Sequence, residues 1–442
     1  METEARSIVA RLREAGHAAY YAGGCVRDAL LGLTPGDYDI ATGASPAEVQ
    51  QLFKRTYAVG VHFGVVIVLI GRNEYQVATF RTDGVYIDGR HPEKVTFATP
   101  EQDAWRRDFT INGMFYDPMT RDVIDYVGGR ADLQARLIRA IGNPDDRFRE
   151  DRLRLLRAVR FAATFGFAIE PATWQAIRTH APTIGKISPE RIREELVRIF
   201  MGRHRVAGLD LLSESGLLKE VLPEVEALKG CEQPPQFHPE GDVYVHTRRM
   251  LELLPEKVSL PLVLSVLFHD IGKPPTFTVD TDGRIRFNGH DKVGAEMTEA
   301  VMTRLRFSRE TIDTTVEAVA RHMIFKDVQK MRVARLKRFM AHPHFDDELE
   351  LHRVDCASSH GMLDNYDFLK TQREVFAAEP LIPPPLINGR DLIALGWKPG
   401  PEIGEVLEAV ETRQLEGSLA TREEALAFVR EHYRQWRGKR LK

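Results

Sequence analysis

The chain has 442 residues, of which 43% are hydrophobic and 28% charged, and its 61 Lys and Arg nearly balance its 64 Asp and Glu. This length suggests about two to four domains, and the composition excludes fibrous, disordered and histone-like proteins. No apolar run reaches the roughly 20 residues that cross a bilayer, the first residues do not read as a secretion signal, and the cysteines form no CxxC pair, so we expect a cytoplasmic protein without disulfides or a zinc ribbon.

The first third of the chain alternates helix-like and strand-like segments. Helical periodicity predicts a helix over residues 5–15 that ends at Gly16. The consecutive aliphatic residues at 65–70 predict a strand that is buried on both faces. Residues 82–100 are rich in Gly, Asp and Pro and indicate a loop. Segments rich in β-branched and aromatic residues predict strands over 37–42, 62–70 and 75–80.

The rest of the chain has mostly helical patterns. Helices, several with Pro or Ser near their starts, are predicted over residues 146–165, 171–180, 188–201 and 206–214. One hairpin is expected at 277–287 around Asp282-Gly283. Proline-containing segments at 233–239 and 381–386 are the candidate linkers. These patterns predict an α+β fold, with an α/β head over residues 1–144 and helical parts over 145–232, 233–380 and 381–442.

A glycine turn and two aspartates form the first candidate site. Gly23-Gly24 opens a short predicted helix, where backbone N–H groups can approach a phosphate, and Arg27 can add a charge-assisted bond. Asp37 and Asp39 begin a predicted strand, on which residues i and i+2 share a face, so their carboxylates can hold one cation. Mg²⁺ sites commonly combine such carboxylates with substrate phosphates. Each motif alone is common in solvated turns, but their order and spacing together predict a Mg²⁺-dependent nucleotide site.

These residues also carry a family resemblance. Gly23–Asp28, Asp37–Thr42, Arg106–Asn112 and Glu150–Arg157 resemble, in this order, the head motifs of class II tRNA nucleotidyltransferases and bacterial poly(A) polymerases. The resemblance implies a polymerase-β-like nucleotidyltransferase head, in which Asp37 and Asp39 are catalytic and hold the metal. It also implies nucleotide contacts, to ribose and triphosphate, from Gly23, Gly24, Arg27, Arg107, Asp108 and Asn112. The family usually has a further acidic residue where this chain has Gln76, so a third carboxylate, Asp83 or Glu74, stays open.

Asp151, Arg154 and Arg157 are spaced i, i+3, i+6 on a predicted helix and are expected to share one face. Cytosine and adenine present an amino donor beside a ring-nitrogen acceptor, whereas guanine and uracil present the reverse. A fixed acceptor at Asp151 and a fixed donor at Arg154 would match C or A, and each group left unpaired by G or U would cost about 1–3 kcal/mol. The alternative is a solvated helix with a Glu150–Arg154 pair, worth roughly 0.2–0.5 kcal/mol. By the resemblance, Asp151, Arg154 and Arg157 bind and select CTP and ATP.

Two further segments bear on the substrate through the same resemblance. Relatives that add the terminal A keep a flexible stretch like residues 83–92, so its presence here argues against an enzyme that adds only CC. Residues 60–64 are more similar to the tRNA-type enzymes than to the poly(A)-type enzymes. The basic end of the chain is expected to contact RNA phosphates, although terminal basic residues are as often only solubilising.

Histidines and acidic residues recur through the helical half. His269-Asp270 ends an apolar run at 262–268, which would bury the pair inside a helix bundle. Imidazole and carboxylate ligands suit Mn²⁺, Ni²⁺, Fe or Mg²⁺ better than a thiolate-type site does. Any of these histidines alone could be a packed or exposed residue. The candidate ligands, in chain order, are His246, His269, Asp270, His290, His322 and Asp355.

This order of ligands resembles the HD phosphohydrolase superfamily. The resemblance implies an HD-type domain over 233–380, between a nucleotide-selecting neck at 145–232 and a tail at 381–442. It implies a site for Ni²⁺ or Mn²⁺ with phosphatase or 2′,3′-cyclic phosphodiesterase activity, on damaged RNA ends or small nucleotides. Together the motifs predict a Mg²⁺-dependent enzyme that adds CCA, or its terminal A, to tRNA 3′ ends from CTP and ATP. The alternatives are a poly(A) polymerase and an HD phosphohydrolase with an inactive head, and the sequence does not define an oligomeric state.

Overall fold

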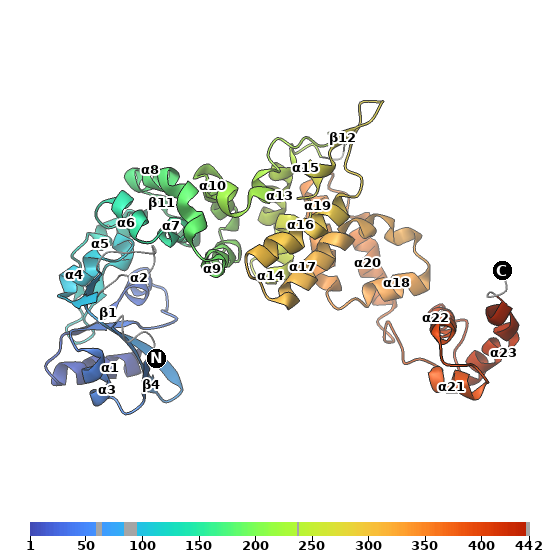
Figure 1. Cartoon of the computed structure of the whole chain (residues 1–442), viewed down its shortest axis with the longest axis horizontal. Helices are drawn as coiled ribbons and strands as arrows, with labels where there is room; N and C mark the ends of the chain where they lie inside the picture. The colour runs from blue at the N-terminus through green and yellow to red at the C-terminus, as the bar shows by residue number, and fades with distance from the viewer. Residues whose placement is uncertain (59–63, 84–94, 237, 439–442) are drawn as a thin grey trace. The chain divides into compact units, whose positions relative to one another are not determined.

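The computed structural model describes residues 1–58, 64–83, 95–236 and 238–438 of the chain (Figure 1). The chain forms two compact units, one of Met1–Ala227 with Ala300–Ser308, the other of Leu228–Glu299 with Arg309–Lys442. The first unit contains a mixed sheet and the helices that follow it, and the second is almost entirely helical, which confirms the predicted fold class. No helix in the described part of the chain is long and apolar enough to cross a membrane.

A seven-stranded sheet forms the centre of the head. Its strands are β1 (Ala19–Ala22), β2 (Ile40–Thr42), β3 (Thr56–Ala58), β4 (Val65–Ile70), β5 (Asn73–Thr79), β8 (Phe115–Tyr116) and β9 (Val123–Ile124). They lie in the order β3-β4-β5-β2-β1-β8-β9, in which β2 and β5 are parallel and the other neighbours antiparallel. The helices α1 (Glu2–Glu14) and α3 (Pro46–Leu52) pack together beside this sheet (Figure 1).

The head differs from the sequence predictions in three places. β2 begins at Ile40, so Asp37 and Asp39 precede the strand instead of lying on it. β4 is not buried on both faces, because Val66 and Val68 are buried while the other four residues of the strand are half-buried, as in a strand covered on one side. The predicted loop at 82–100 is wrong at its ends, where β6 (Arg81–Asp83) pairs with β7 (Val95–Phe97), and residues 84–94 lie outside the described residues.

The predicted helix over 146–165 is two helices, α6 (Pro144–Glu150) and α7 (Leu153–Phe165). Asp151 separates them with an extended backbone, φ −138° and ψ 106°, and its Oδ1 accepts a hydrogen bond from the Leu153 N–H at 3.0 Å. An aspartate that satisfies a free N–H at the start of the next helix competes with continued helix formation. The helices predicted next are confirmed as α8 (Pro171–His180), α9 (Pro189–Phe200) and α10 (Arg205–Glu214).

The second unit is a bundle of helices, and the predicted hairpin is confirmed as β12 (Thr278–Val279) with β13 (Ile285–Arg286). The bundle contains α13 (Val243–Leu253), α14 (Leu260–Phe268), α15 (Lys273–Thr276), α16 (His290–Arg304), α17 (Arg309–Arg321), the 3-10 helix η4 (His322–Lys330), α18 (Val333–Met340), α19 (Phe345–Ser358) and α20 (Asp364–Val375). Three more helices follow near the end of the chain, α21 (Gly389–Ala394), α22 (Pro401–Leu415) and α23 (Arg422–Gly438).

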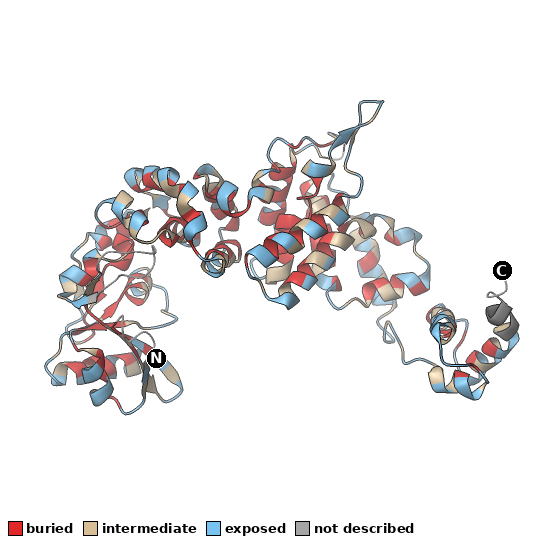
Figure 2. Ribbon diagram, viewed as in Figure 1, coloured by how far each residue is buried: buried red, intermediate tan, exposed pale blue. Residues whose placement is uncertain are grey.

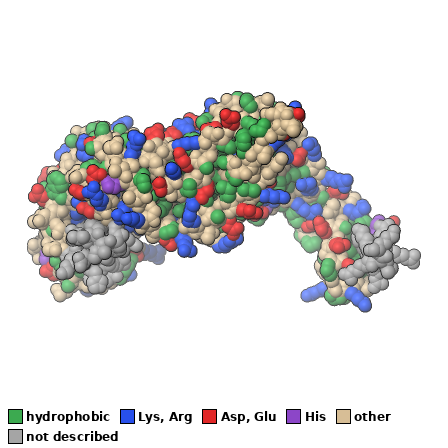
Figure 3. Space-filling view, turned by 45° about the horizontal axis from the view of Figure 1, so that its top comes forward, with side chains coloured by type: hydrophobic (Ala, Val, Ile, Leu, Met, Phe, Trp, Pro, Cys, Tyr) green, Lys and Arg blue, Asp and Glu red, His purple; other side chains and the backbone are tan. Residues whose placement is uncertain are grey.

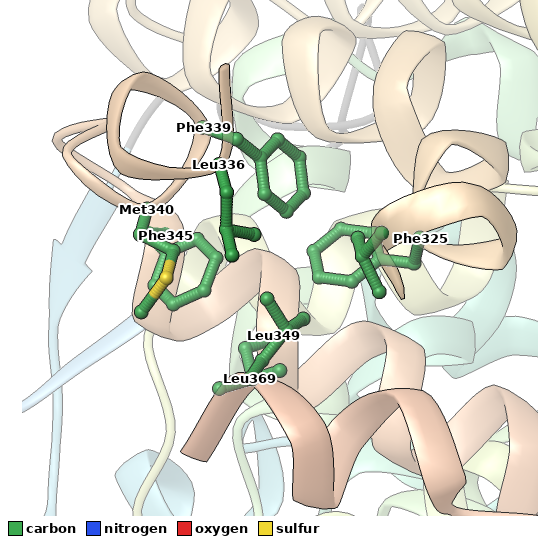
Figure 4. Packing of buried hydrophobic residues seen from close by; sticks show 8 residues of the cluster. Phe325, Leu336, Phe339, Met340, Phe345, Leu349 and Leu369 are labelled. Carbon is green, nitrogen blue, oxygen red and sulfur yellow. The ribbon is translucent and has the colours of Figure 1, made fainter. Parts of the chain in front are cut away.

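Buried residues follow the sheet and the inward faces of the helices (Figure 2). One core cluster joins η4 to α18, α19 and α20, and the rings of Phe325 and Phe339 meet in it at a centroid distance of 4.9 Å (Figure 4). A separate cluster around Trp397 and Val406 holds α21, α22 and α23 together. The end of the chain therefore has a core of its own, distinct from that of the helix bundle.

Candidate active site and metal centre

A cleft of about 590 Å³ in the first unit gathers the candidate residues of the head. Among the described residues, nine arginines and five aspartates line it, so its charge suits a polyphosphate. The sequence-predicted residues that it brings together are Gly23, Gly24, Arg27, Asp37, Asp39, Arg107, Asp108, Asn112, Asp151, Arg154 and Arg157.

The glycine turn leads into α2 (Gly24–Leu30) at one wall of this cleft. Gly23 has φ +71°, which glycine adopts without the strain that other residues incur. A Cβ atom at Gly23 would lie 3.1 Å from Arg107 Nη1, and one at Gly24 would lie 3.6 Å from Arg27 Nη2. The two glycines therefore keep the space beside two guanidinium groups open, where a phosphate can approach the backbone.

Asp37 and Asp39 lie immediately before β2 and face the same cleft. Asp37 is exposed and Asp39 is half-buried. Burial, together with the charge of Asp37, raises the pKa of Asp39 to about 6 against the opposing charge of Arg107. Burial and the neighbouring carboxylate make the ionised form of Asp39 unfavourable. A divalent cation bound between the two carboxylates would stabilise that form, so these residues fit Mg²⁺.

The strand register shows which residue stands where the family usually has a third carboxylate. Ile40 lies beside Val77 in the parallel β2–β5 pair, so Gln76 is level with Asp39. Glu74 lies further back on β5, where its side chain accepts a hydrogen bond from Tyr57. The side chain of Asp83 lies outside the described residues. The departure from the family pattern at Gln76 thus falls directly beside a candidate metal ligand.

A chain of hydrogen bonds orders the polar side chains of the cleft. Arg27 Nη1 donates to Asn112 Oδ1 at 2.6 Å, and Asn112 Nδ2 donates to Asp108 Oδ1 at 3.1 Å. Arg157 Nε donates to Asp108 Oδ2 at 2.8 Å. Burial of Asp108 opposes its ionisation, but Arg157 and Asn112 outweigh burial and hold its pKa at about 2. These bonds fix Arg27 and Arg157 in place before any ligand binds.

Asp103, which the sequence analysis did not identify, positions two arginines from the end of α4 (Pro100–Trp105). Its buried carboxylate accepts hydrogen bonds from Arg107 Nη2 at 3.0 Å and from Arg106 Nε at 2.8 Å. Burial opposes its ionisation, yet the charges of Arg107 and Arg106 hold the pKa of Asp103 below its ordinary value. The i, i+3, i+4 spacing of these residues was a local signal for this contact.

The proposed base-reading residues do not share one helix face, so that prediction is wrong. Asp151 stands between α6 and α7, whereas Arg154 belongs to α7, as does Arg157. Arg154 Nη1 donates to Glu150 Oε2 at 2.7 Å, so the ion pair expected in the alternative is present. Asp151 Oδ2 accepts a hydrogen bond from Arg191 Nη2 at 2.9 Å. Asp151 and Arg154 nevertheless line the same cleft.

Five arginines that were not predicted as site residues also line the cleft: Arg81, Arg106, Arg160 of α7, and Arg191 and Arg198 of α9. Arg160 Nε donates to the buried carboxylate of Glu195 at 2.6 Å. Arg191 and Arg198 reach the cleft because α9 packs along α7. Their role depends on a tertiary contact, and no motif around residues 189–200 signals it.

In the second unit, three histidines present the same nitrogen to a common centre. The Nδ1 atoms of His269, His290 and His322 lie 2.9, 2.8 and 2.6 Å from backbone carbonyl oxygens three residues earlier. Donation from Nδ1 leaves Nε2 unprotonated and available as a ligand. His290 Nε2 lies 3.2 Å from His322 Nε2, and His269 Nε2 is buried. Unprotonated nitrogens that face one another fit a metal cation.

Asp270 lies among these nitrogens. Its Oδ2 is 3.0 Å from His269 Nε2, and its Oδ1 is 3.6 Å from His290 Nε2 and 4.0 Å from His322 Nε2. Lys273 Nζ contacts Oδ2 at 2.7 Å. Burial opposes the ionisation of Asp270, but the positive charges around it, that of Lys273 among them, outweigh burial and hold its pKa well below the ordinary range. The carboxylate is therefore charged, as a metal ligand must be.

His246 and Asp355 complete this cluster. His246 Nε2 lies 3.1 Å from Asp355 Oδ1, and the ligand atoms of His246, His269 and Asp270 lie within 4.8 Å of one another. Glu240, which the sequence analysis missed, accepts from His246 Nδ1 at 2.8 Å and from His238 Nδ1 at 2.9 Å. All six predicted residues thus meet in one cluster of imidazoles and carboxylates, a donor set that fits Mn²⁺ or Ni²⁺.

Four family models match successive parts of the chain. The poly(A) polymerase head domain covers residues 19–139, and the RNA and SrmB-binding site of polymerase A covers residues 166–229. The HD domain covers residues 243–352, and domain 2 of tRNA nucleotidyltransferases covers residues 383–429. The cleft residues of the head lie within the first model, and Asp151, Arg154 and Arg157 lie between the first two models. The residues of the histidine cluster, except Asp355, lie within the HD domain model.

Relatives match the chain along almost its whole length. The CCA-adding enzyme of Latilactobacillus sakei is 33% identical over 433 residues, which are 96% of each chain. That of Lactiplantibacillus plantarum is 47% identical over 218 residues, 49% of this chain and 53% of the relative. The crystal structure of the Bacillus stearothermophilus CCA-adding enzyme in complex with CTP is 28% identical, with a TM-score of 0.76 over 99% of this chain and 98% of that one.

Proposed function

The chain belongs to the CCA-adding enzymes, a family of tRNA nucleotidyltransferases, and we propose that its head cleft adds C, C and A to the 3′ end of tRNA from CTP and ATP. The observation that carries the proposal is the gathering of the paired aspartates, the glycine turn and the arginines in one cleft. Relatives matched along the whole chain bear this activity in their name, which favours it over a poly(A) polymerase, over A-only addition and over a phosphohydrolase with an inactive head.

The residues of the cleft would have different roles in the transfer reaction. CCA-adding enzymes use a divalent metal ion, and Asp37 and Asp39 would hold Mg²⁺, which supplies Lewis-acid stabilisation of phosphoryl oxygens when bound. The terminal hydroxyl of tRNA forms a bond to the α-phosphorus, the bond from that phosphorus to the bridging oxygen breaks, and pyrophosphate leaves. Arg27 and Arg107 would compensate the charge of the triphosphate beside the glycine turn. Asn112 holds Arg27 and Asp103 holds Arg107, while Asp108 and Asn112 would contact the ribose.

Base selection belongs to Asp151 and Arg154, which line the same cleft. Asp151 would accept from the exocyclic amino group of cytosine or adenine, and Arg154 would donate to the neighbouring ring nitrogen. Uracil and guanine would leave both protein groups unmatched, at a cost of about 1–3 kcal/mol each. Arg157 lines the same cleft, is held by a hydrogen bond to Asp108, and would contact the bound nucleotide.

Single-nucleotide addition tests this proposal directly. Purified protein is incubated with tRNA that ends in the discriminator base, in C or in CC, and with one labelled triphosphate at a time. We expect CTP to extend the first two substrates and ATP to extend only the third. Long A-tails on an RNA without a tRNA elbow would identify a poly(A) polymerase instead, and A addition alone would identify an A-only enzyme.

A second activity is supported by the histidine cluster of the HD domain. We propose that this cluster is the active site of a metal-dependent phosphohydrolase, because three buried imidazoles present unprotonated Nε2 atoms to one charged carboxylate. The residues that would hold Mn²⁺ or Ni²⁺ are His246, His269, Asp270, His290, His322 and Asp355, and the metal would supply activation of water. Hydrolysis of 2′,3′-cyclic nucleotides and phosphomonoesters with Ni²⁺, Mn²⁺ or Mg²⁺ tests this activity, and no turnover of any of them would make the cluster structural.

The domain assignment is part of the same proposal. We assign the head to 1–144, the nucleotide-selecting neck to 145–232, the HD domain to 233–380 and an RNA-contacting tail to 381–442. The boundaries of the four family models support this division, since each model lies largely within one segment. We place the reaction in the cytoplasm, where tRNA and the nucleoside triphosphates meet.

A further inference from the structure

A groove of about 430 Å³ lies beside the candidate metal centre of the HD domain. Met323 and Ile324 line it and directly follow His322 in the chain, while Asp291 lines it and directly follows His290. Further along, the groove is lined by Lys326 and Lys330 of η4 and by Arg335 of α18. We call it the basic groove, after these three cations.

The local charge of this groove is unusual for the chain. Acidic and basic side chains are interspersed on the face of the molecule in Figure 3, whereas residues 326–338 contain six basic residues and one acidic residue. Two of the six have structural contacts elsewhere, since Lys337 lies over the ring of Phe376 and Arg338 pairs with Glu411 at 2.6 Å. The cations of the groove itself are exposed.

Asp327 is the acidic residue of this run and does not neutralise it. Lys330 Nζ donates to Asp327 Oδ1 at 2.8 Å. The pKa of Asp327 is lowered by this bond and by the charges of Lys330, Lys326 and Arg335, so three cations act on one carboxylate. Asp291 also lines the groove, so its three cations face two carboxylates and one net positive charge is left for an anionic ligand.

The floor of the groove is apolar and firmly held. Phe325 and Val328 are buried in the core cluster of Figure 4, so the residues between and after them on η4 turn toward the surface. Ile324 and Met331 are partly buried and pack against the same cluster. Positively charged grooves that follow the backbone bind single-stranded nucleic acid, usually together with aromatic side chains on which bases stack. Among the described residues no aromatic side chain lines this groove, so its cations would bind the phosphates while Met323, Ile324 and Met331 offer apolar contact to the bases.

We propose that the basic groove binds single-stranded RNA next to its 3′ end, so that the HD centre acts on phosphorylated RNA ends in preference to free nucleotides. The proposal rests on the phosphohydrolase function of that centre. A free cyclic mononucleotide has only the phosphate that reacts. The cations of the groove can bind further phosphates only if the substrate is an RNA chain that continues past the reacting phosphate. At a 2′,3′-cyclic end, a water oxygen bonds to phosphorus, one phosphorus–ribose oxygen bond breaks, and the released ribose oxygen takes a proton.

The test compares two substrates that present the same reacting group, the mononucleotide 2′,3′-cyclic AMP and an RNA oligonucleotide that ends in a 2′,3′-cyclic phosphate. The groove variant is the full chain with Lys326→Ala, Lys330→Ala and Arg335→Ala. A matched control carries Arg249→Ala, Lys257→Ala and Arg284→Ala, which also removes three exposed cations from the second unit. Rates are measured with Mn²⁺ or Ni²⁺ at several salt concentrations.

We expect the groove variant to lose about 10- to 100-fold in kcat/KM on the oligonucleotide, through KM, and to hydrolyse cyclic AMP like the wild type. Its salt dependence on the oligonucleotide should be shallower, by roughly one unit of slope for each phosphate contact removed. The control variant should match the wild type on both substrates. Equal losses on both substrates, or no loss on the oligonucleotide, would overturn the proposal.

A different result separates failure of this inference from failure of the phosphohydrolase function. If the wild type hydrolyses neither substrate with any of these metals, the phosphohydrolase function is wrong. Binding of a labelled 3′-phosphorylated oligoadenylate, followed by fluorescence anisotropy, then decides about the groove alone. An affinity that falls in the groove variant but not in the control supports RNA binding, and an unchanged affinity rejects it.

Discussion

Replacing Asp151 by alanine tests the base-reading proposal at the residue on which it depends most. The change removes the acceptor for the amino group of cytosine or adenine and leaves the donors of Arg154 in place. Loss of a hydrogen bond to a charged group costs about 1.5–3 kcal/mol, so incorporation of C and A should fall by roughly one to two orders of magnitude. Incorporation of U and G should fall much less or rise, because the mismatch between their carbonyl group and the carboxylate is gone.

The same change also has a structural cost that must be separated from base selection. The Asp151 carboxylate accepts a hydrogen bond from the Leu153 N–H at the start of α7 and pairs with Arg191, so it supports the helix start as a cap does. Loss of such a cap costs about 0.5–2 kcal/mol of stability. That loss lowers the amount of folded enzyme for all four nucleotides equally, so the ratio of rates for C and U isolates the recognition effect.

The assay is single-nucleotide incorporation of each of the four triphosphates on tRNA that ends in C. A matched control is Asp146→Ala, which removes a carboxylate of the same segment that is exposed and pairs with Arg149 at 3.0 Å. The control should retain the wild-type rates and ratios. An unchanged C-to-U ratio in Asp151→Ala, with a small uniform loss for all nucleotides, would show that Asp151 only supports the helix junction.

Three further substitutions test whether the two sites act independently and whether the pKa of Asp39 is raised. Asp39→Ala should abolish incorporation of CTP and ATP while the metal-dependent phosphohydrolase activity persists, and wild-type incorporation would contradict the metal assignment. His269→Ala should do the reverse, with loss of phosphohydrolase activity and normal incorporation, because the cleft lies in the other compact unit. Asp39→Asn should raise the Tm of the metal-free protein at pH 8. The folded pKa of about 6 lies above the ordinary value, so the wild type loses stability as pH rises through 6, and the difference in Tm should vanish near pH 4.

Short-range patterns predicted the parts of the site that depend on neighbouring residues. The glycine turn, Asp37 and Asp39 lie within 17 residues of one another in the sequence, and all of them face the cleft. The order of these motifs carried the family resemblance, which the whole-chain relatives confirm. The first residues of α8 and α9 were predicted to within one position, because the proline at the start of each helix is also a local signal.

Apart from Asp103, whose contacts with Arg106 and Arg107 are local, the residues that sequence analysis missed act through tertiary contacts. Arg191 reaches Asp151 from a helix 40 residues later, and Glu240 orients His246 from a loop without regular structure. Neither contact has a fixed spacing or periodicity that a linear pattern can reveal. The break at Asp151 was missed for a different reason, since helical periodicity continues across it and only the side-chain bond to Leu153 shows that the helix stops.

The contacts of Arg154 allow both interpretations of this residue, the ion pair with Glu150 and base reading. A guanidinium has five N–H groups, and Arg154 uses three of them, toward Glu150, the Arg147 carbonyl and the Arg106 carbonyl. Two N–H groups remain without a partner among the described residues, on a side chain whose orientation is fixed. The Glu150–Arg154 pair is therefore compatible with base reading, because an arginine held by three internal acceptors presents its remaining donors without the entropy cost of ordering them.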